Sequence, residues 1–201
     1  GITRIPLQFE AYESYFLVFD PERTGSTAEG HRNFYAKNEA SSLEGPWEVH
    51  FDPAWGGPEK VVFSELEDWT RRPEEGIKYY SGTATYVKSF DCPQAKGTGK
   101  LYLDLGDVQV MARVRLNGED LGVAWTLPWQ VEITETVELT GNRLEIEVAN
   151  LWANRLIGDE AYPDNGIRDG LWPEWVMKRE PRPGQRYTFA SWRHYTKDDP
   201  L

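Results

Sequence analysis

Aromatic side chains in predicted loops are the residues of this sequence that offer the clearest chemistry. The chain has nine Trp and ten Tyr among its 201 residues. Their rings have flat apolar faces on which a sugar ring can stack, and they also fill the cores of β-proteins. Trp55 lies in a Gly-rich loop, Tyr79 and Tyr80 precede a long predicted strand, and Trp125 and Trp129 follow a predicted hairpin. We therefore expect a few of the aromatic side chains to be partly exposed.

A second chemical signal is the pair Arg155 and Asp159 within residues 154–159. Planar guanidinium and carboxylate groups are commonly used to hydrogen-bond sugar hydroxyls. The same groups also form charge-assisted pairs with one another or with loop carbonyls. We favour this structural interpretation, because such a pair is a usual way to fix a loop at a strand end. Both residues are nevertheless retained as candidate carbohydrate-binding residues.

The acidic residues do not indicate a catalytic pair. Two carboxyl groups about 5 Å or roughly 6.5–9.5 Å apart could hydrolyse a glycosidic bond, but 33 Asp and Glu residues make such pairs plentiful. The sequence contains no Gly-x-Ser-x-Gly motif and no Ser-His-Asp order, and its three His and one Cys lack zinc-ligand spacing. We therefore expect no catalytic residue and no zinc site.

The charge of the chain excludes two classes of partner. A formal net charge of −11 lacks the Lys/Arg excess that nucleic acids and anionic membranes require. We expect neither as a partner, whereas a neutral glycan meets no such penalty. The arginines Arg179, Arg182, Arg186 and Arg193 could form a basic patch, but we expect them to be solvated or to face another domain. Cys92 is the only cysteine, so no intrachain disulfide can form.

The elements that would position these residues are mostly short β-strands. Asn117-Gly118 between alternating apolar positions is a strong hairpin signal, because a type I′ turn needs positive φ at both central residues. Two short helical turns are expected, at 66–69 and within 171–178. Many short strands with turn residues between them indicate an all-β sandwich. The predicted strands are 47–51, 60–63, 81–90, 100–105, 110–116, 120–124, 130–133 and 143–148.

Several of these segments together resemble a known family. The motifs are LNGxxLG at 116–122, GNRLEIEVANLWANRLIGD at 141–159, YYSGTATYVKSF at 79–90 and LYLDLGDV at 101–108. They resemble the galactose-binding-like jelly roll of large bacterial glycoside hydrolases. The similarity is greatest to the C-terminal β-sandwich of family 106 enzymes, the α-L-rhamnosidase type, and more distant to family 2 sugar-binding domains. The resemblance covers roughly the whole chain and is strongest from Trp47 to Asp159.

The resemblance implies an all-β, galactose-binding-like jelly-roll β-sandwich with short flanking extensions, which accompanies a catalytic barrel. Residues 1–42 then form the end of a preceding β module, with strands at 5–9 and 14–19, followed by a linker. Residues 43–159 form the jelly-roll, carbohydrate-binding-like domain. Residues 160–201 form a C-terminal extension packed on the sandwich.

In such domains the ligand usually meets the loops at one end of the sandwich or its concave face. This makes Trp55, Tyr79, Tyr80, Trp125 and Trp129 the candidate sugar platforms. In the alternative interpretation they cap the core or face the neighbouring catalytic domain. The resemblance requires no cofactor, although a structural calcium ion in a loop would fit the superfamily.

Two functions remain in competition at this level. In the first, the chain is a non-catalytic carbohydrate-binding module that binds or positions plant or algal polysaccharide. In the second, it is a structural accessory domain that packs against the catalytic barrel and has no ligand of its own. A complete small enzyme would need a catalytic constellation that the sequence does not show. The family further implies a secreted or periplasmic bacterial protein whose partner is the catalytic domain of its parent enzyme.

Overall fold

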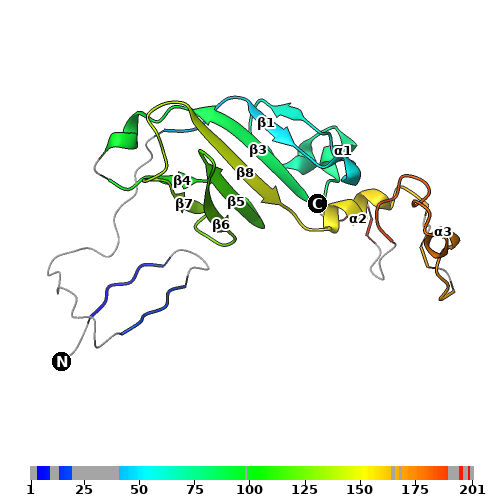
Figure 1. The fold of residues 1–201 in the computed structure, drawn as a ribbon. Coiled ribbons are helices and arrows are strands. Elements are labelled where there is room, and N and C mark those ends of the chain that lie inside the picture. Colours follow the sequence, from blue (N-terminus) through cyan, green and yellow to red (C-terminus); the bar gives the residue numbers. More distant parts are fainter. Residues whose placement is uncertain are drawn as a thin grey trace.

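The computed structural model shows a mostly antiparallel β-structure (Figure 1). A six-stranded sheet has the order β2-β1-β3-β8-β5-β6, and β4 and β7 form a second, two-stranded sheet. The strands are β1 Trp47–His50, β2 Val61–Phe63, β3 Thr83–Phe90, β4 Tyr102–Asp104, β5 Met111–Leu116, β6 Glu119–Ala124, β7 Gln130–Glu132 and β8 Asn142–Ala149. The structure describes residues 4–9, 14–19, 41–97, 99–163, 166–167, 169–189, 195–196 and 199.

One hydrophobic core joins the two sheets. Along β5, Val114 and Leu116 are buried, whereas the preceding Arg113 is exposed. This is the period-two alternation of a strand with one buried face. Leu103 of β4 and Val131 of β7 pack against the same core. The predicted all-β sandwich is confirmed.

A group of aromatic rings closes the core beside β1 and β3. The centroid of the Tyr80 ring lies 4.9 Å from that of Phe51 and 5.8 Å from that of Trp69. The indole N–H of Trp69 donates a hydrogen bond to the hydroxyl of Tyr86. Burial raises the pKa of Tyr86 to about 12, because the phenolate form would lose its hydration. These rings are structural.

The β5–β6 hairpin forms where the sequence predicts it. Asn117 and Gly118 have φ values of 54° and 86°, as a type I′ turn requires. The pairing register shifts between Val114 and Arg115, which indicates a β-bulge. All eight predicted strands have a counterpart in the structure, with ends that differ by a few residues.

Short helices fill the connections between strands. Three of them are α1 Glu75–Lys78, α2 Ala153–Asp159 and α3 Glu174–Met177, and 3-10 turns occupy Pro53–Trp55, Trp69–Arg71 and Pro93–Lys96. The helix predicted within 171–178 corresponds to α3. The turn predicted at 66–69 is displaced, because the 3-10 turn occupies Trp69–Arg71 and shares only Trp69 with it. The sequence does not predict helix α2, because its residues follow directly on a strand pattern.

The described N-terminal segments are extended but contain no strand. The sequence predicts strands at 5–9 and 14–19, and neither segment belongs to a sheet in the structure. The rings of Phe9 and Tyr15 pack edge to face, with centroids 5.3 Å apart. Most of the predicted linker lies outside the described residues. No helix in the described part of the chain has the length and apolar character needed to span a membrane.

Candidate functional site

Strand register brings most of the predicted site loops to one end of the large sheet. His50, Thr85, Glu147, Arg113 and Val123 are successive partners across five strands. The predicted aromatic residues are in segments that adjoin these strand ends. These segments therefore all lie at the same end of the sheet. Adjacent strands lie about 4.8 Å apart, so the loop after β6 starts roughly 10 Å from the end of β8, where α2 begins.

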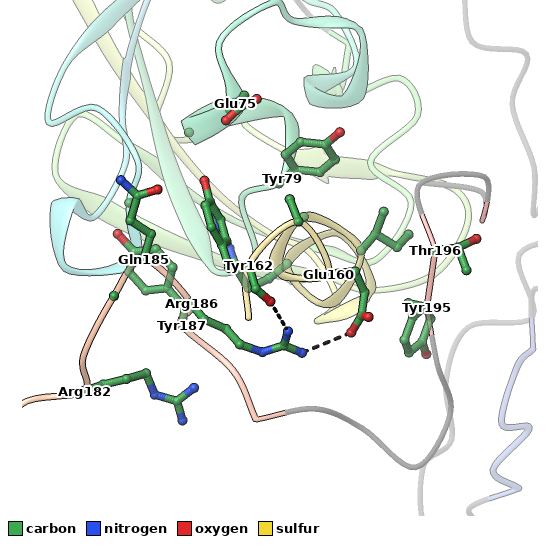
Figure 2. A pocket seen from close by; sticks show the side chains of 17 residues that line it. Glu75, Tyr79, Glu160, Tyr162, Arg182, Gln185, Arg186, Tyr187, Tyr195 and Thr196 are labelled. Carbon is green, nitrogen blue, oxygen red and sulfur yellow. Dashed lines mark hydrogen bonds and ion pairs between the residues drawn. The ribbon is translucent and has the colours of Figure 1, made fainter. Parts of the chain in front are cut away.

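An open pocket of about 1010 Å³ lies at this end. We call it the end pocket. It is lined by residues of α1 and α2, by residues 182–187, and by Tyr195 and Thr196. We call residues 182–188 the C-terminal arm. Tyr79, Tyr162, Tyr187 and Tyr195 contribute rings, and Figure 2 shows Glu75, Glu160 and Gln185 around the same space. Its volume is at the upper end of the roughly 300–1,000 Å³ typical of small-molecule sites.

Three glycines allow the walls of the end pocket to approach closely. A Cβ atom on Gly158 of α2 would lie 2.6 Å from the Cβ and Cγ atoms of Tyr79. A Cβ atom on Gly76 would lie 2.5 Å from the carbonyl oxygen of Gly56, and one on Gly56 would lie 2.7 Å from the hydroxyl of Tyr187. Real Cβ atoms do not tolerate such distances, so each glycine is needed for this packing.

Asp159 fastens the C-terminal arm to α2. Its side chain is fully buried. Oδ2 accepts hydrogen bonds from the backbone N–H groups of Tyr187 and Thr188, at 2.9 and 2.6 Å, and from the Thr188 hydroxyl at 2.8 Å. Hydrogen bonds to a carboxylate are stronger than neutral ones. The position of the arm, and with it one wall of the end pocket, therefore depends in part on this carboxylate.

Arg186 reinforces the same attachment from the arm side. Its guanidinium is almost fully buried, and Nη1 donates to the backbone carbonyls of Asp159 and Tyr162 at 2.9 and 3.0 Å. Nη2 donates to Glu160 Oε1 at 3.0 Å (Figure 2). The prediction that this arginine is solvated or faces another domain is wrong, because the side chain satisfies the carbonyls at the end of α2.

Arg155 contacts Asp159 and is also a lining residue of the end pocket. Its Nη1 atom is 3.6 Å from Asp159 Oδ1, and its guanidinium lies over the Tyr187 ring, 4.8 Å from the centroid. Its backbone N–H donates to the Ser81 hydroxyl. The favoured interpretation of the Arg155–Asp159 pair as a structural contact agrees with this geometry, although Asp159 accepts its side-chain hydrogen bonds from the arm rather than from a strand-end loop.

The structure places the predicted carbohydrate-binding residues in different surroundings. Tyr79 and Arg155 line the end pocket. Trp55 is partly exposed beside it and packs against Tyr187 and Trp152, at centroid distances of 6.5 and 5.3 Å.

Trp125, with 71% of its surface exposed, and the partly buried Trp129 lie outside the pocket lining. Tyr80 requires a correction: it is completely buried among core rings, so it cannot act as a sugar platform. Its hydroxyl accepts from the Asp52 N–H and donates to the Thr83 carbonyl.

The sequence analysis missed Tyr162, Tyr187 and Glu160 as pocket residues. They follow α2 or belong to the C-terminal arm, where apolar spacing is irregular and gives no periodic signal. The resemblance is also weaker in that part of the chain. These three residues reach the end pocket through the folding of the chain, and no local sequence pattern indicates this.

The outer face of the large sheet has a different character. Arg115 pairs with Glu147 at 2.5 Å and Arg143 with Glu145 at 2.6 Å. Arg113 pairs with Asp120 and holds the pKa of that exposed carboxyl at about 2. The outward side chains of β5 and β8 are charged or aliphatic, so these strands offer no aromatic platform for a sugar ring.

The described residues contain no cluster of three or more His, Cys, Asp or Glu side chains arranged to hold a metal ion. Calcium sites can also use backbone carbonyls. A structural calcium ion therefore stays an expectation of the sequence analysis.

An antiparallel sandwich with a ligand-sized pocket among the loops at one end defines a galactose-binding-like β-sandwich domain. The chain belongs to the glycosyl hydrolase 2 galactose-binding domain-like family, whose profile matches residues 66–182.

Similar proteins are much longer than this chain. A Formosa agariphila protein that carries the name of a beta-glucuronidase is 43% identical over 165 residues, which are 79% of this chain and 14% of that protein. The structure of a rhamnosidase from Novosphingobium sp. PP1Y matches with 34% identity and a TM-score of 0.62, over 85% of this chain and 15% of that one. A β-glucuronidase from Ruminococcus gnavus matches at 20% identity and a TM-score of 0.48, over 58% and 23% of the two chains.

Proposed function

We propose that this chain is a non-catalytic, carbohydrate-binding accessory domain of a glycoside hydrolase of the α-L-rhamnosidase type, family 106. The observation that carries the proposal is the end pocket, which combines four tyrosine rings with planar hydrogen-bonding side chains in a concave site. Similarity to a rhamnosidase at 34% identity supports the enzyme type. The ligand would be a plant or algal polysaccharide, presented to a catalytic domain elsewhere in the parent enzyme.

The chemistry of the end pocket suits a sugar. Tyrosine rings stack on the C–H faces of pyranoses, and Glu75, Gln185 and Arg155 offer both acceptors and donors for hydroxyl groups. The charged outer face of the sheet lacks these features on β5 and β8. We therefore assign the ligand to the end of the sandwich.

Titration calorimetry with L-rhamnose, D-galactose and pectic oligosaccharides, with and without calcium, tests the proposal. We expect weak binding, with Kd between about 1 mM and high micromolar, or about −4 to −6 kcal/mol. Tyr79→Ala should abolish it, and Trp125→Ala, a matched exposed aromatic outside the pocket, should leave it unchanged.

Loss of binding in Trp125→Ala alone would place the site in the loop 125–129 instead. The absence of binding to every sugar by the folded wild-type protein would refute the carbohydrate-binding role.

A structural accessory role is the second candidate, and a specific observation favours it. Leu151, Trp152, Leu171, Trp172 and Met177 are large apolar side chains that are more than half exposed. We call them the apolar C-terminal surface. Exposed apolar surface of this kind often marks a protein contact. In this role the surface would pack against the catalytic domain of the parent enzyme. We also propose that the parent enzyme is exported to the periplasm or outside the cell.

A further inference from the structure

Two exposed tryptophans continue the aromatic lining of the end pocket. The centroid of the Trp55 ring lies 6.5 Å from that of Tyr187, a lining residue, and 5.3 Å from that of Trp152. Trp55 is 39% exposed and Trp152 is 52% exposed. We call Trp55 and Trp152 the tryptophan pair. The aromatic rings therefore form a connected series that leads out of the pocket.

The backbone that carries Trp55 is fixed by hydrogen bonds. Asp52 caps the 3-10 turn Pro53–Trp55, because its side chain accepts a hydrogen bond from the Ala54 N–H at 2.9 Å. The backbone N–H of Asp52 donates to the hydroxyl of the buried Tyr80 at 3.1 Å. Trp55 therefore belongs to a turn that is tied to the core of the sandwich.

The backbone that carries Trp152 is tied to the same core residue. The side-chain amide of Asn150 donates to the Tyr80 carbonyl at 2.8 Å and accepts from the Gly82 N–H at 3.0 Å. Trp152 directly precedes helix α2, and its carbonyl accepts from the Leu156 N–H at 3.0 Å. Both indoles are thus exposed side chains on a fixed backbone. Rings held in this way lose little conformational entropy when a ligand binds.

The spacing of the rings suits consecutive units of a sugar chain. The steps of 6.5 and 5.3 Å between successive ring centroids are comparable with the length of one pyranose unit. The C–H faces of pyranoses stack on aromatic rings. A chain with one unit in the end pocket therefore has its next units within reach of the tryptophan pair. The planes of the two indoles are 77° apart, so the pair fits a single bent chain better than a flat surface.

We propose that the tryptophan pair is a second sugar subsite and that the domain recognises an extended oligosaccharide chain. One unit of the chain lies in the end pocket and the following units lie on Trp55 and Trp152. The proposal rests on the proposed carbohydrate-binding function and adds chain length as the property that is recognised. Trp152 also belongs to the apolar C-terminal surface, so its contact with a protein domain is the alternative that the experiments separate.

Series of linear oligosaccharides test the subsite on the wild-type protein. The probes, titrated by calorimetry, are L-rhamnose with rhamnogalacturonan oligosaccharides, D-galactose with β-1,4-linked galacto-oligosaccharides, and D-galacturonate with oligogalacturonates. In a series that binds, affinity should rise about tenfold or more from the monosaccharide to the longer oligomers, because further rings are covered. A longer chain also offers more binding positions. A rise no greater than this number of positions would overturn the proposal.

The variant Trp152→Ala separates a sugar subsite from a protein contact. It should bind the longer oligomers only about as tightly as the wild type binds the monosaccharide, whereas Trp152→Phe, which keeps a ring, should retain most of the gain. Trp125→Ala removes an exposed tryptophan outside the pocket lining. This matched control should keep the full dependence on chain length.

The fold of these variants is checked by a thermal melt. Trp152 makes no side-chain hydrogen bond that caps α2, so its replacement by Ala should leave the helix intact. Oligomer affinities in a folded Trp152→Ala protein that equal those of the wild type would refute the subsite and assign this side chain to the apolar C-terminal surface.

A second readout uses the unchanged protein. Longer oligomers, added to wild-type protein, should shift the indole N–H NMR signals of Trp55 and Trp152, which are identified by their loss in Trp55→Phe and Trp152→Phe. Binding of the longest oligomer with both signals unchanged would contradict the proposal. Failure of every sugar in all series to bind the wild type would instead refute the proposed function.

Discussion

Single close contacts determine the shape of the end pocket. Tyr79 owes its position to Gly158, the one residue of α2 whose missing side chain leaves room for the phenol ring. This contact places an aromatic ring above the helix that also contributes Arg155, as Figure 2 shows for Tyr79. The position of the Tyr79 ring therefore depends on the absence of a Cβ atom at Gly158.

Substitution of Gly158 by Ala should damage both stability and binding. The new Cβ would lie 2.6 Å from Tyr79 Cβ and Cγ, so α2 or Tyr79 has to move. Overpacking of this kind costs about 1–3 kcal/mol, to be measured by urea denaturation, and sugar affinity should fall with it. Gly99→Ala is the control, since a Cβ atom added there would have no neighbour within 4 Å. A Gly158→Ala protein with wild-type stability would contradict the described packing.

At the scale of elements, the attachment of the C-terminal arm to α2 makes the site. Helix α2 supplies Arg155 and Asp159, and the arm supplies Arg186 and Tyr187. The buried carboxylate and guanidinium that join them are thus positioning groups for the end pocket.

Replacement of Asp159 by Ala should release the arm. Three hydrogen bonds to Tyr187 and Thr188 disappear, and Arg155 is left as a buried charge without its counter-ion. Removal of one partner of a buried pair typically costs about 3–5 kcal/mol. Limited trypsinolysis should then cut after Arg186, which is buried in the wild type.

Asp107→Ala, a substitution in an exposed loop, should leave both stability and the digestion pattern unchanged. Resistance of Arg186 to trypsin in a destabilised Asp159→Ala protein would mean that other contacts hold the arm.

The strands could be predicted from the sequence, whereas the site could be predicted only in part. Alternation along 110–116 and the Asn117-Gly118 turn are local signals, so β5, β6 and their hairpin follow directly. Tyr79 and Arg155 are identified through resemblance and spacing. Tyr80, the immediate neighbour of Tyr79, is misassigned because adjacent residues in a pre-strand segment carry no information about which one faces the core. The arm residues are near α2 only in space.

At the scale of the whole molecule, a strong negative charge coexists with an exposed apolar region. The net charge of −11 keeps copies of the chain apart at low salt. The apolar C-terminal surface favours contact once that repulsion is screened. The relatives that this chain matches are several times longer than it is.

Self-association of the isolated chain should therefore rise with salt. Between about 0.01 M and about 1 M salt the screening length falls from about 30 Å to about 3 Å, and sedimentation velocity should show larger species. The double substitution Leu171→Ser and Trp172→Ser should suppress them. Val62→Ser, which removes an exposed apolar side chain from β2, should not. A monomer at every salt concentration would argue against a contact role for this surface.

The position of β8 has a consequence for synthesis of the protein. It is the last strand of the large sheet in the sequence, yet it lies between β3 and β5 and pairs along their lengths (Figure 1). On the ribosome, β3 emerges early and keeps an open edge until residues 142–149 follow. Open edges invite pairing with other chains. A nascent chain that stops before Asn142 should therefore aggregate instead of folding into a smaller domain.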